Sequence, residues 1–532
     1  MAQAAPTARA AETAPVVHLD AAVPRAVPAP EPAAKGPTAR AWTPTLHTVW
    51  LGLAVLAAAL GAALQPMEPI DYWWSVRLGG LIRQFGALPV DDPLVYTPVR
   101  AALVDGQWLG RVILSTLHDL GGIELSLTLR TAVAIGAALI LARLCRQAGA
   151  GSRLAAVVSG ISVILFVPGL AVRPQLLAVL PFLVVLMAAT KPPRSVLGVA
   201  AVALTVVFWA NVHGSFILVY PLLGVSVLVA AADWLRTGNG ALLRRAVILA
   251  VACGLAPLLN PHGFGLAGYV SDTVLFNGGG MSVGILGVEW GAPAIRTAYG
   301  ALFYGSVVLV IGLLAAGCRP RLTEGLLLLG FGLLAVSSVR HILWWSLIVT
   351  PFVARSLAEI VARPGPHWLP RPGPLPAGSA LLNVTCLALF GVLIVVSLPW
   401  YRERLPLPPA RTALLDRDTP VAVAEYLAAN PLDGHLFNDT NWSAYLTWRL
   451  APDTRVFVDN RFEAHPPEVW EEYSTISQGH VSWQRRLDAH GVTRLALNPE
   501  TQRGLLSAVR ESAAWQPVYE DSQAVVFVRE RR

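Results

Sequence analysis

The feature that most constrains the fold is a series of apolar stretches, each about 20 residues long. They lie near residues 44–65, 125–145, 153–171, 174–190, 194–211, 214–233, 243–260, 297–317, 321–338, 341–360 and 378–400. A helix of this length spans the hydrocarbon core of a bilayer. Only 14% of the residues are charged, against about 25% in ordinary soluble domains. The sequence therefore predicts an α-helical polytopic membrane protein with about eleven spans.

The two ends of the chain differ from this apolar part. Residues 1–42 are rich in Ala and Pro, and we expect a disordered cytoplasmic tail. The transmembrane domain is expected over 43–402, with a long first outer loop over 66–122. Residues 403–532 alternate apolar runs with helical stretches, which predicts a small C-terminal α/β soluble domain. We expect helices at 419–430, 466–478 and 500–512, and extended segments at 436–437, 456–458, 495–497 and 524–528.

The distribution of basic residues predicts the orientation. Alternate connections carry them, for example Lys191 with Arg194 and Arg319 with Arg321. The positive-inside rule places these connections in the cytoplasm and the first loop and C-terminal region outside. We therefore expect the N-terminus in the cytoplasm, and the family resemblance described below implies a bacterial inner-membrane location. The cytoplasmic Lys and Arg residues account for the net charge of +7. The sequence has no basic stripe interleaved with aromatic residues, so we expect no nucleic-acid partner.

Unusual polar residues gather in the connections that this assignment places outside. They are Asp71, Asp91, Asp92, Arg173, Gln175, Asn211, His213, Asn260, His262, Glu289, Trp290, Arg340 and His341. Ionisable groups at membrane depth are costly and are functional candidates by default. We expect them to line a cavity that opens outward.

The first loop begins with Asp71-Tyr72-Trp73-Trp74. Apolar residues continue from Trp74 to Phe85 at helical spacing, which predicts an amphipathic helix at the membrane interface with Asp71 at its start. Asp71 is then either a helix cap or a catalytic carboxylate. The Trp pair is typical of interface anchors, and Asp91-Asp92-Pro93 is also ordinary turn chemistry.

Several short motifs resemble a known group of enzymes. They are the run 89–97 (Pro-Val-Asp-Asp-Pro-Leu-Val-Tyr-Thr), residues 209–214 and 260–263, and, in the soluble part, 437–438, 445–446 and 456–461. Together they resemble the GT-C superfamily of polyprenyl-phosphate-dependent glycosyltransferases, which includes protein mannosyltransferases and the aminoarabinose and Rgt-type transferases. The resemblance covers about 66–532. The chain departs from the family at Ser75, Val76 and Arg77, where a His often follows the Trp pair.

The resemblance implies a function and roles for residues. The donor would be a sugar linked to a polyprenyl phosphate in the membrane lipids, and the acceptor a lipid, glycan or protein. The acceptor must lose a proton, which makes Asp71 the expected general base. The leaving phosphate needs cations or hydrogen-bond donors, expected from Arg340, Arg173 and His341. The remaining expected substrate-binding residues are Trp74, Asn211, His213, Asn260 and Glu289. Asp91 and Asp92, with Asp71, could hold Mg²⁺ or Mn²⁺.

Two other functions remain open from the sequence. A transporter or lipid flippase would carry polar residues on both faces of the membrane. A catalytically inactive GT-C-like scaffold would keep the fold without needing Asp71. Individual residues also have plainer interpretations: Arg173 can snorkel at a turn, the histidines can be structural, and Asp459, Arg461 and Glu463 can form a network within the soluble domain.

Overall fold

The computed structural model describes residues 44–87, 92–99, 106–270, 289–363, 378–431, 433–461 and 464–530. The expected tail over 1–42 lies outside these ranges, as does Asp91. By its contacts, Pro44–Arg532 forms one compact unit.

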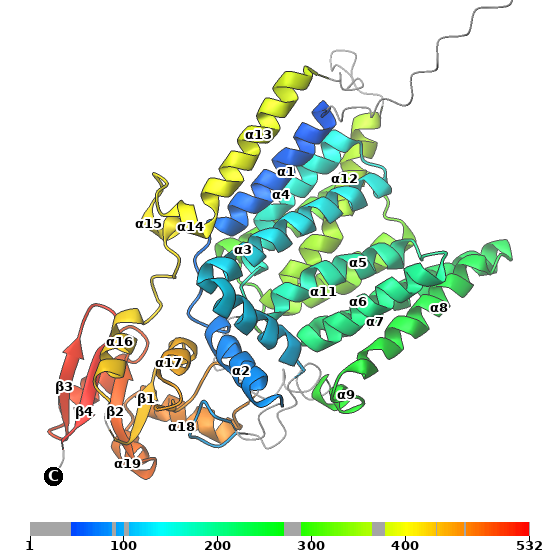
Figure 1. Ribbon diagram of the computed structural model, residues 1–532. Helices are drawn as coiled ribbons and strands as arrows, with labels where there is room; N and C mark the ends of the chain where they lie inside the picture. Colours follow the sequence, from blue (N-terminus) through cyan, green and yellow to red (C-terminus); the bar gives the residue numbers. More distant parts are fainter. Residues whose placement is uncertain are drawn as a thin grey trace, which may run out of the picture. The chain divides into compact units, whose positions relative to one another are not determined.

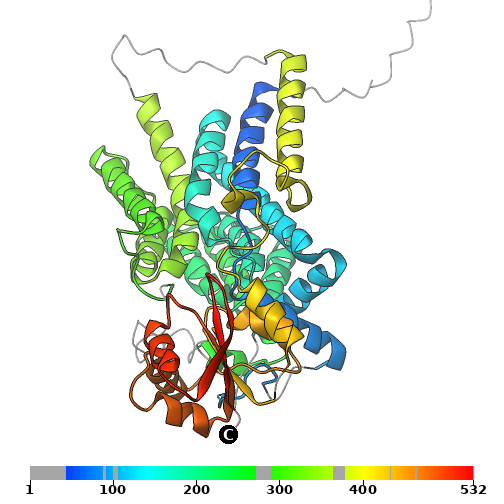
Figure 2. The same ribbon diagram turned by 90° about the vertical axis from the view of Figure 1, so that its left-hand side faces the viewer.

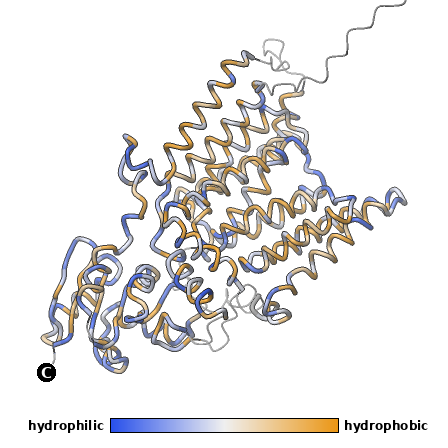
Figure 3. Tube along the Cα trace, viewed as in Figure 1, coloured by the Kyte–Doolittle hydropathy of each residue, from blue (hydrophilic) through white to orange (hydrophobic). Residues whose placement is uncertain are grey.

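Long apolar helices make up most of this unit (Figures 1 and 3). Within the described ranges, eight helical stretches are long and apolar enough to cross a membrane. They are Leu46–Ala63 (α1), Trp108–Ala148 (α3), Ser152–Gly169 (from α4), Gly214–Thr237 (to α7), Ala241–Leu259 (from α8), Ala298–Ala315 (α10), Val339–Ala362 (to α12) and Ala380–Ser397 (α13). Three shorter apolar stretches are Pro174–Thr190 (to α5), Val196–Val212 (α6) and Leu322–Ser337 (α11). The two sets (8 and 3) are the eleven predicted segments, of which eight have the full length. The chain is a multi-pass membrane protein.

Tight three-ten turns adjoin many of these helices. They are η1 (Val167–Gly169), η2 (Pro174–Ala178), η3 (Gly214–Leu218), η4 (Ala256–Leu259) and η6 (Val339–His341). Three of them carry a proline at their first or second position, where a missing N–H costs no internal hydrogen bond. These turns place Arg173, His213, Asn260 and Arg340 directly at helix ends.

The first loop contains more helix than the sequence predicted. The expected helix is α2 (Tyr72–Phe85), which ends at Gly86 with φ 65°. The helix α3 already begins at Trp108 and is interrupted at Gly121 and Gly122, where φ and ψ leave the helical region and Gly122 has φ 64°. Residues 108–120 are therefore helical within the expected loop.

The helix α2 lies between protein elements and packs on α3 and on α17 (Ser443–Leu450). Trp73 is 1% exposed and Trp74 is 5% exposed. Trp73 contacts the rings of Tyr445 and Trp448, with centroids 4.7 and 4.6 Å away. The prediction of the Trp pair as membrane-interface anchors is therefore wrong, because both rings are buried in protein.

The C-terminal region is the predicted small α/β part (Figure 2). Its strands are β1 (His435–Asn438), β2 (Val492–Leu497), β3 (Trp515–Glu520) and β4 (Val525–Arg529), in the order β1-β2-β4-β3. The β1–β2 pair is parallel and the other two pairs are antiparallel. Its helices are α16 (Val421–Ala429), α17, α18 (Pro467–Ser477), α19 (Trp483–Ala489) and α20 (Arg503–Arg510). Three short helices occur earlier in the chain, namely α9 (Gly265–Val270), α14 (Pro399–Arg402) and α15 (Pro409–Thr412).

The first loop extends this sheet at its edge. Val456 forms isolated parallel bridges to Leu436 of β1 and to Val95 of the loop. The predicted strand 456–458 is thus reduced to single bridges. The Tyr96 N–H donates to the Val456 carbonyl (3.2 Å), and the Val456 N–H donates to the Leu94 carbonyl (3.1 Å). The loop that follows Asp71 is therefore held by the C-terminal region.

Candidate functional site

Asp71 directly precedes α2, but its side chain does not cap the helix. One carboxylate oxygen accepts a hydrogen bond from Arg173 Nη1 (3.2 Å) and the other accepts one from Asn460 Nδ2 (2.8 Å). The Asp71 side chain is 19% exposed. Its charge is therefore directed toward groups from distant parts of the chain, which disfavours the helix-cap interpretation.

Arg173 and Arg340 converge on one carboxylate. Arg173 Nη1 donates to Glu289 Oε2 at 2.9 Å, and Arg340 Nε donates to the same oxygen at 3.2 Å. The Arg340 guanidinium also lies over the Trp290 ring, 4.3 Å from its centroid. The two guanidiniums thus form an anion-binding arrangement in which Glu289 is the anion.

The Glu289 carboxyl is ionised because of these contacts. Burial alone would raise its pKa, but Arg173 and Arg340 outweigh burial and lower the pKa to about 2. The Glu289 backbone is held as well, since its carbonyl accepts from the Ser338 hydroxyl at 2.9 Å and from the Arg340 N–H at 3.2 Å.

A cavity of about 140 Å³ adjoins this cluster, lined among others by Glu68, Arg173, Gln175, Glu289, Tyr299 and Arg340. At ~30 Å³ per water in the liquid, it has room for a phosphate-sized anion. Among the described residues, the buried Arg173 Nε and Tyr299 hydroxyl have no hydrogen-bond partner. Buried polar atoms are almost always paired, so these two donors point to a ligand with acceptor oxygens.

Glu68 and Tyr299 were not predicted as site residues. Glu68 lines the cavity, and its side chain is accessible from there. Protein atoms surround its carboxyl on the other sides. Burial raises the pKa of its carboxyl, and the nearby charges of Glu289 and Asp71 raise it further against the opposing effect of Arg173. The available signal was a second carboxylate three positions before Asp71 in the same loop.

The two predicted histidines flank the arginines differently. His213 Nδ1 accepts from the Ser215 N–H at 3.0 Å, which leaves its proton on Nε2. Burial lowers the His213 pKa well below its usual value, and the charges of Arg340 and Arg173 lower it further. His213 is therefore a neutral donor near both arginines. His341 follows Arg340 directly, and its buried Nδ1 has no partner among the described residues.

Asn211 and Asn260 link helix ends. Asn211 Nδ2 donates to the Val207 carbonyl (2.8 Å), and its Oδ1 accepts from Trp108 Nε1 (2.9 Å). Asn260 Nδ2 donates to the Ala210 carbonyl at 3.1 Å. These contacts give both amides a structural role, and their part in substrate binding stays a prediction.

Two guanidiniums lie over the Trp74 ring. The guanidiniums of Arg111 and Arg461 are 4.7 and 5.7 Å from its ring centroid. Arg461 also pairs with Asp92 at 2.7 Å, and the Asp92 carboxylate accepts from the Leu94 N–H at 2.8 Å. Trp74 and Asp92 thus belong to the contact between the first loop and the C-terminal region.

Two of the three carboxylates predicted to hold Mg²⁺ or Mn²⁺ are paired with arginines, and the metal site stays a prediction. Asp71 pairs with Arg173 and Asp92 with Arg461, while Asp91 is outside the described residues. Within the described part of the chain, no group of three or more His, Cys, Asp and Glu side chains is placed to hold a metal ion.

Asn460 is a further site residue, and it was not predicted from the sequence. It stands between Asp459 and Arg461, whose side chains are 0% and 5% exposed and pair at 2.5 Å. Its Nδ2 faces the Asp71 carboxylate, and its buried Oδ1 has no partner among the described residues. The C-terminal region therefore contributes a side chain that contacts Asp71.

Comparison with known proteins gives a distant structural likeness. No protein-family model and no curated protein sequence matches the chain. The chain is similar to crystal structures of ArnT from Cupriavidus metallidurans in the apo state and bound to undecaprenyl phosphate, with TM-scores of 0.47 and 0.46. Both are 14% identical, and each alignment covers 90% of this chain and 97% of the other. At this distance the likeness assigns neither a family nor an activity.

Proposed function

We propose that the protein is a membrane glycosyltransferase that moves a sugar from a polyprenyl-phosphate donor to a lipid, glycan or protein acceptor at the outer face of the membrane. The observation that carries the proposal is the cavity lined by Arg173 and Arg340, where the buried Arg173 Nε and Tyr299 hydroxyl have no hydrogen-bond partner among the described residues. Asp71 pairs with Arg173 at its edge. This transfer needs a carboxylate that accepts the acceptor's proton and, beside it, cationic groups that bind the phosphate.

The reaction is a single displacement. The acceptor hydroxyl or amine attacks the anomeric carbon, Asp71 accepts the proton, and the bond between that carbon and the phosphate oxygen breaks. The leaving polyprenyl phosphate gains one negative charge, because a phosphodiester becomes a phosphomonoester. Arg173 and Arg340 stabilise this charge. Attack opposite the leaving group inverts the configuration at the anomeric carbon.

In this proposal the donor phosphate takes the place of the Glu289 carboxylate. Glu289 contacts the guanidiniums of both Arg173 and Arg340, so it occupies the position that a phosphate oxygen would need. The exchange conserves charge, since a phosphodiester carries one negative charge. His213 is a neutral donor and His341 lies beside Arg340, so both are placed to add hydrogen bonds to the phosphate.

Asn460 positions the base. The hydrogen bond from its Nδ2 orients one Asp71 oxygen and leaves the proton-accepting lone pairs to the acceptor. The crystal structure of ArnT bound to undecaprenyl phosphate contains a polyprenyl phosphate, the chemical class of the leaving group in the proposed reaction.

The test compares Asp71→Asn with Asp119→Asn in a deletion strain of the native host. Asp119 is 56% exposed and pairs with Arg83 in the same loop, so Asp119→Asn removes the same charge away from Arg173. Surface glycans are profiled by mass spectrometry, with membrane levels of each variant checked. We expect the Asp71 variant to lose one sugar as the deletion does, with transfer reduced about 10²–10⁴-fold, and Asp119→Asn to restore wild-type glycans.

A binding experiment separates the donor site from the base. Farnesyl phosphate, a short polyprenyl phosphate, is titrated against the purified protein. We expect Asp71→Asn to retain binding and the Arg173→Gln, Arg340→Gln double variant to lose it. A deletion that changes glycans while Asp71→Asn does not would assign the base to another residue. Unchanged glycans in both strains would favour the scaffold or the transporter.

A further inference from the structure

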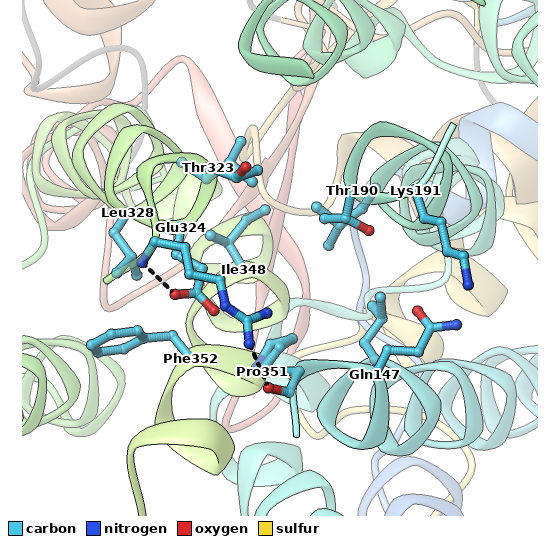
Figure 4. A pocket seen from close by; sticks show the side chains of 14 residues that line it. Gln147, Thr190, Lys191, Thr323, Glu324, Leu328, Ile348, Pro351 and Phe352 are labelled. Atoms are coloured by element: carbon cyan, nitrogen blue, oxygen red, sulfur yellow. Dashed lines mark hydrogen bonds between the residues drawn. The ribbon is translucent and has the colours of Figure 1, made fainter. Parts of the chain in front are cut away.

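A second and larger cavity lies away from Asp71. It has a volume of about 400 Å³, within the range of roughly 300–1,000 Å³ typical of small-molecule sites. It lies between α3, α5, α11 and α12, at the ends of α5 and α11 that are remote from Arg173 and Arg340. Figure 4 shows Lys191 and Gln147 on one side and Glu324 and Thr323 on the other.

The lining of this cavity has two zones. The apolar side chains are buried, with Leu144, Leu186, Leu327, Ile348 and Phe352 each at most 6% exposed. The polar residues at the rim are exposed, namely Gln147, Thr190, Lys191 and Arg321. An apolar interior with a polar rim fits an amphiphile whose tail is apolar and whose head stays in water.

The charge at the rim is positive. Arg355 donates to the two Glu324 oxygens at 2.9 and 2.7 Å and also pairs with Glu359. These three groups together carry one negative charge, against the two positive charges of Lys191 and Arg321. The Lys191 ammonium has no partner among the described residues, and the Arg321 guanidinium donates to the Ala148 carbonyl at 3.3 Å. Two cationic groups therefore stand without a carboxylate partner in the described part of the chain.

We propose that this cavity binds one anionic phospholipid, with an acyl chain against Leu186 and Ile348 and the phosphate between Lys191 and Arg321. Basic pockets between membrane helices recognise anionic head groups, which concentrate in the cytoplasmic leaflet. Lys191 and Arg321 belong to the basic connections that the positive-inside rule assigns to that side. The site is separate from the transfer site and does not depend on the proposed function.

The test measures lipid retention by native mass spectrometry of the full-length protein, with phosphatidylglycerol and phosphatidylcholine of the same acyl chains. The variant is Lys191→Gln, Arg321→Gln. The control is Arg236→Gln, Arg244→Gln, which removes equal charge from exposed residues of another connection. Because a cation near an anionic lipid contributes about fivefold in affinity, we expect the variant to bind phosphatidylglycerol roughly 25-fold more weakly and the control to match wild type.

A second variant tests the acyl chain. Leu186→Phe narrows the apolar zone without changing charge, and should weaken retention of phosphatidylglycerol while binding of glycerol phosphate, measured alone, stays negligible. Equal retention of both lipids by wild type would overturn the proposal, as would equal losses in variant and control. Tight binding of glycerol phosphate without the chains, or a preference for farnesyl phosphate, would also overturn it, because the occupant would then be a free phosphate or a polyprenyl lipid.

Discussion

Removal of Arg461 should release the first loop from the C-terminal region. Its guanidinium lies 2.7 Å from an Asp92 oxygen and 2.5 Å from an Asp459 oxygen, and the three side chains are 5%, 5% and 0% exposed. Arg461→Met leaves the buried Asp92 carboxylate without its cation and leaves Asp459 with only His465, whose Nε2 lies 3.4 Å away. Loss of one partner of a buried ion pair costs about 3–5 kcal/mol. Local opening of this contact should therefore become roughly a hundred- to a few thousandfold more frequent.

Hydrogen exchange of the purified protein measures this opening. The amides of Tyr96 and Val456 report it, since both hydrogen-bond across the contact. The control is Arg417→Met, because Arg417 is 91% exposed and its partner Asp418 is 72% exposed, and such pairs contribute about 0–1 kcal/mol. Exchange in Arg461→Met that rises less than tenfold, or no more than in the control, would refute the reasoning.

The cause of the loss can be checked with a neutral network. The triple variant Asp92→Asn, Arg461→Met, Asp459→Asn removes all three charges. If the cost arises from unpaired buried charge, the triple variant should recover most of the protection that Arg461→Met loses. If it exchanges as fast as the single variant, packing of the guanidinium on the Trp74 ring is the main contribution instead.

Two further predictions concern packing and pH. A methyl group at Gly79 would lie 2.1 Å from the Arg111 carbonyl oxygen, so Gly79→Ala should separate α2 from α3, cost about 1–3 kcal/mol and lower the unfolding midpoint in detergent. Gly80→Ala, whose methyl meets Ser115 Oγ at 3.5 Å, should leave the midpoint unchanged or raise it, and equal losses in the two variants would contradict the packing argument. The pKa of Glu289 is lowered from 4.5 to about 2, so its stabilisation is fully present above about pH 4.5 and is lost as the pH falls toward 2. Stability measured from pH 6 to pH 2 should fall more steeply in wild type than in Glu289→Gln, and parallel curves would contradict this assignment.

The membrane part could be predicted because a bilayer demands long apolar helices. The eleven predicted segments coincide with apolar helices in the described chain. The helix over 108–120 was missed since it carries Arg111, His118 and Asp119 and leads into a Gly-Gly pair that reads as a break. The strand β3 was missed because it is mostly exposed and contains Pro517, so it lacks the apolar signal of the other strands.

The sequence predicted most of the residues that form the site, but not which of their side chains pair with one another. Counting alternate connections placed Asp71, Arg173, Glu289 and Arg340 on one side, and the structure brings these four together. Which carboxylate faces which guanidinium depends on distances that spacing along the chain does not contain. Asn460 was missed because its neighbours Asp459 and Arg461 were interpreted as an intradomain network, whereas Arg461 also pairs with Asp92 of the first loop.

The contact between the first loop and the sheet edge sets an order of biosynthesis. Asp71 and Asn460 are 389 residues apart in sequence, so at ~5–20 residues per second the ribosome needs about 20–80 s to supply the second after the first. Throughout that time the nascent chain carries Asp71 without its partner from the C-terminal region. A chain released early lacks the hydrogen bond that orients Asp71 and the edge that holds residues 94–97. The site can therefore form only after Asn460 has been made, when all the long apolar helices of the described residues, up to α13, have already been synthesised.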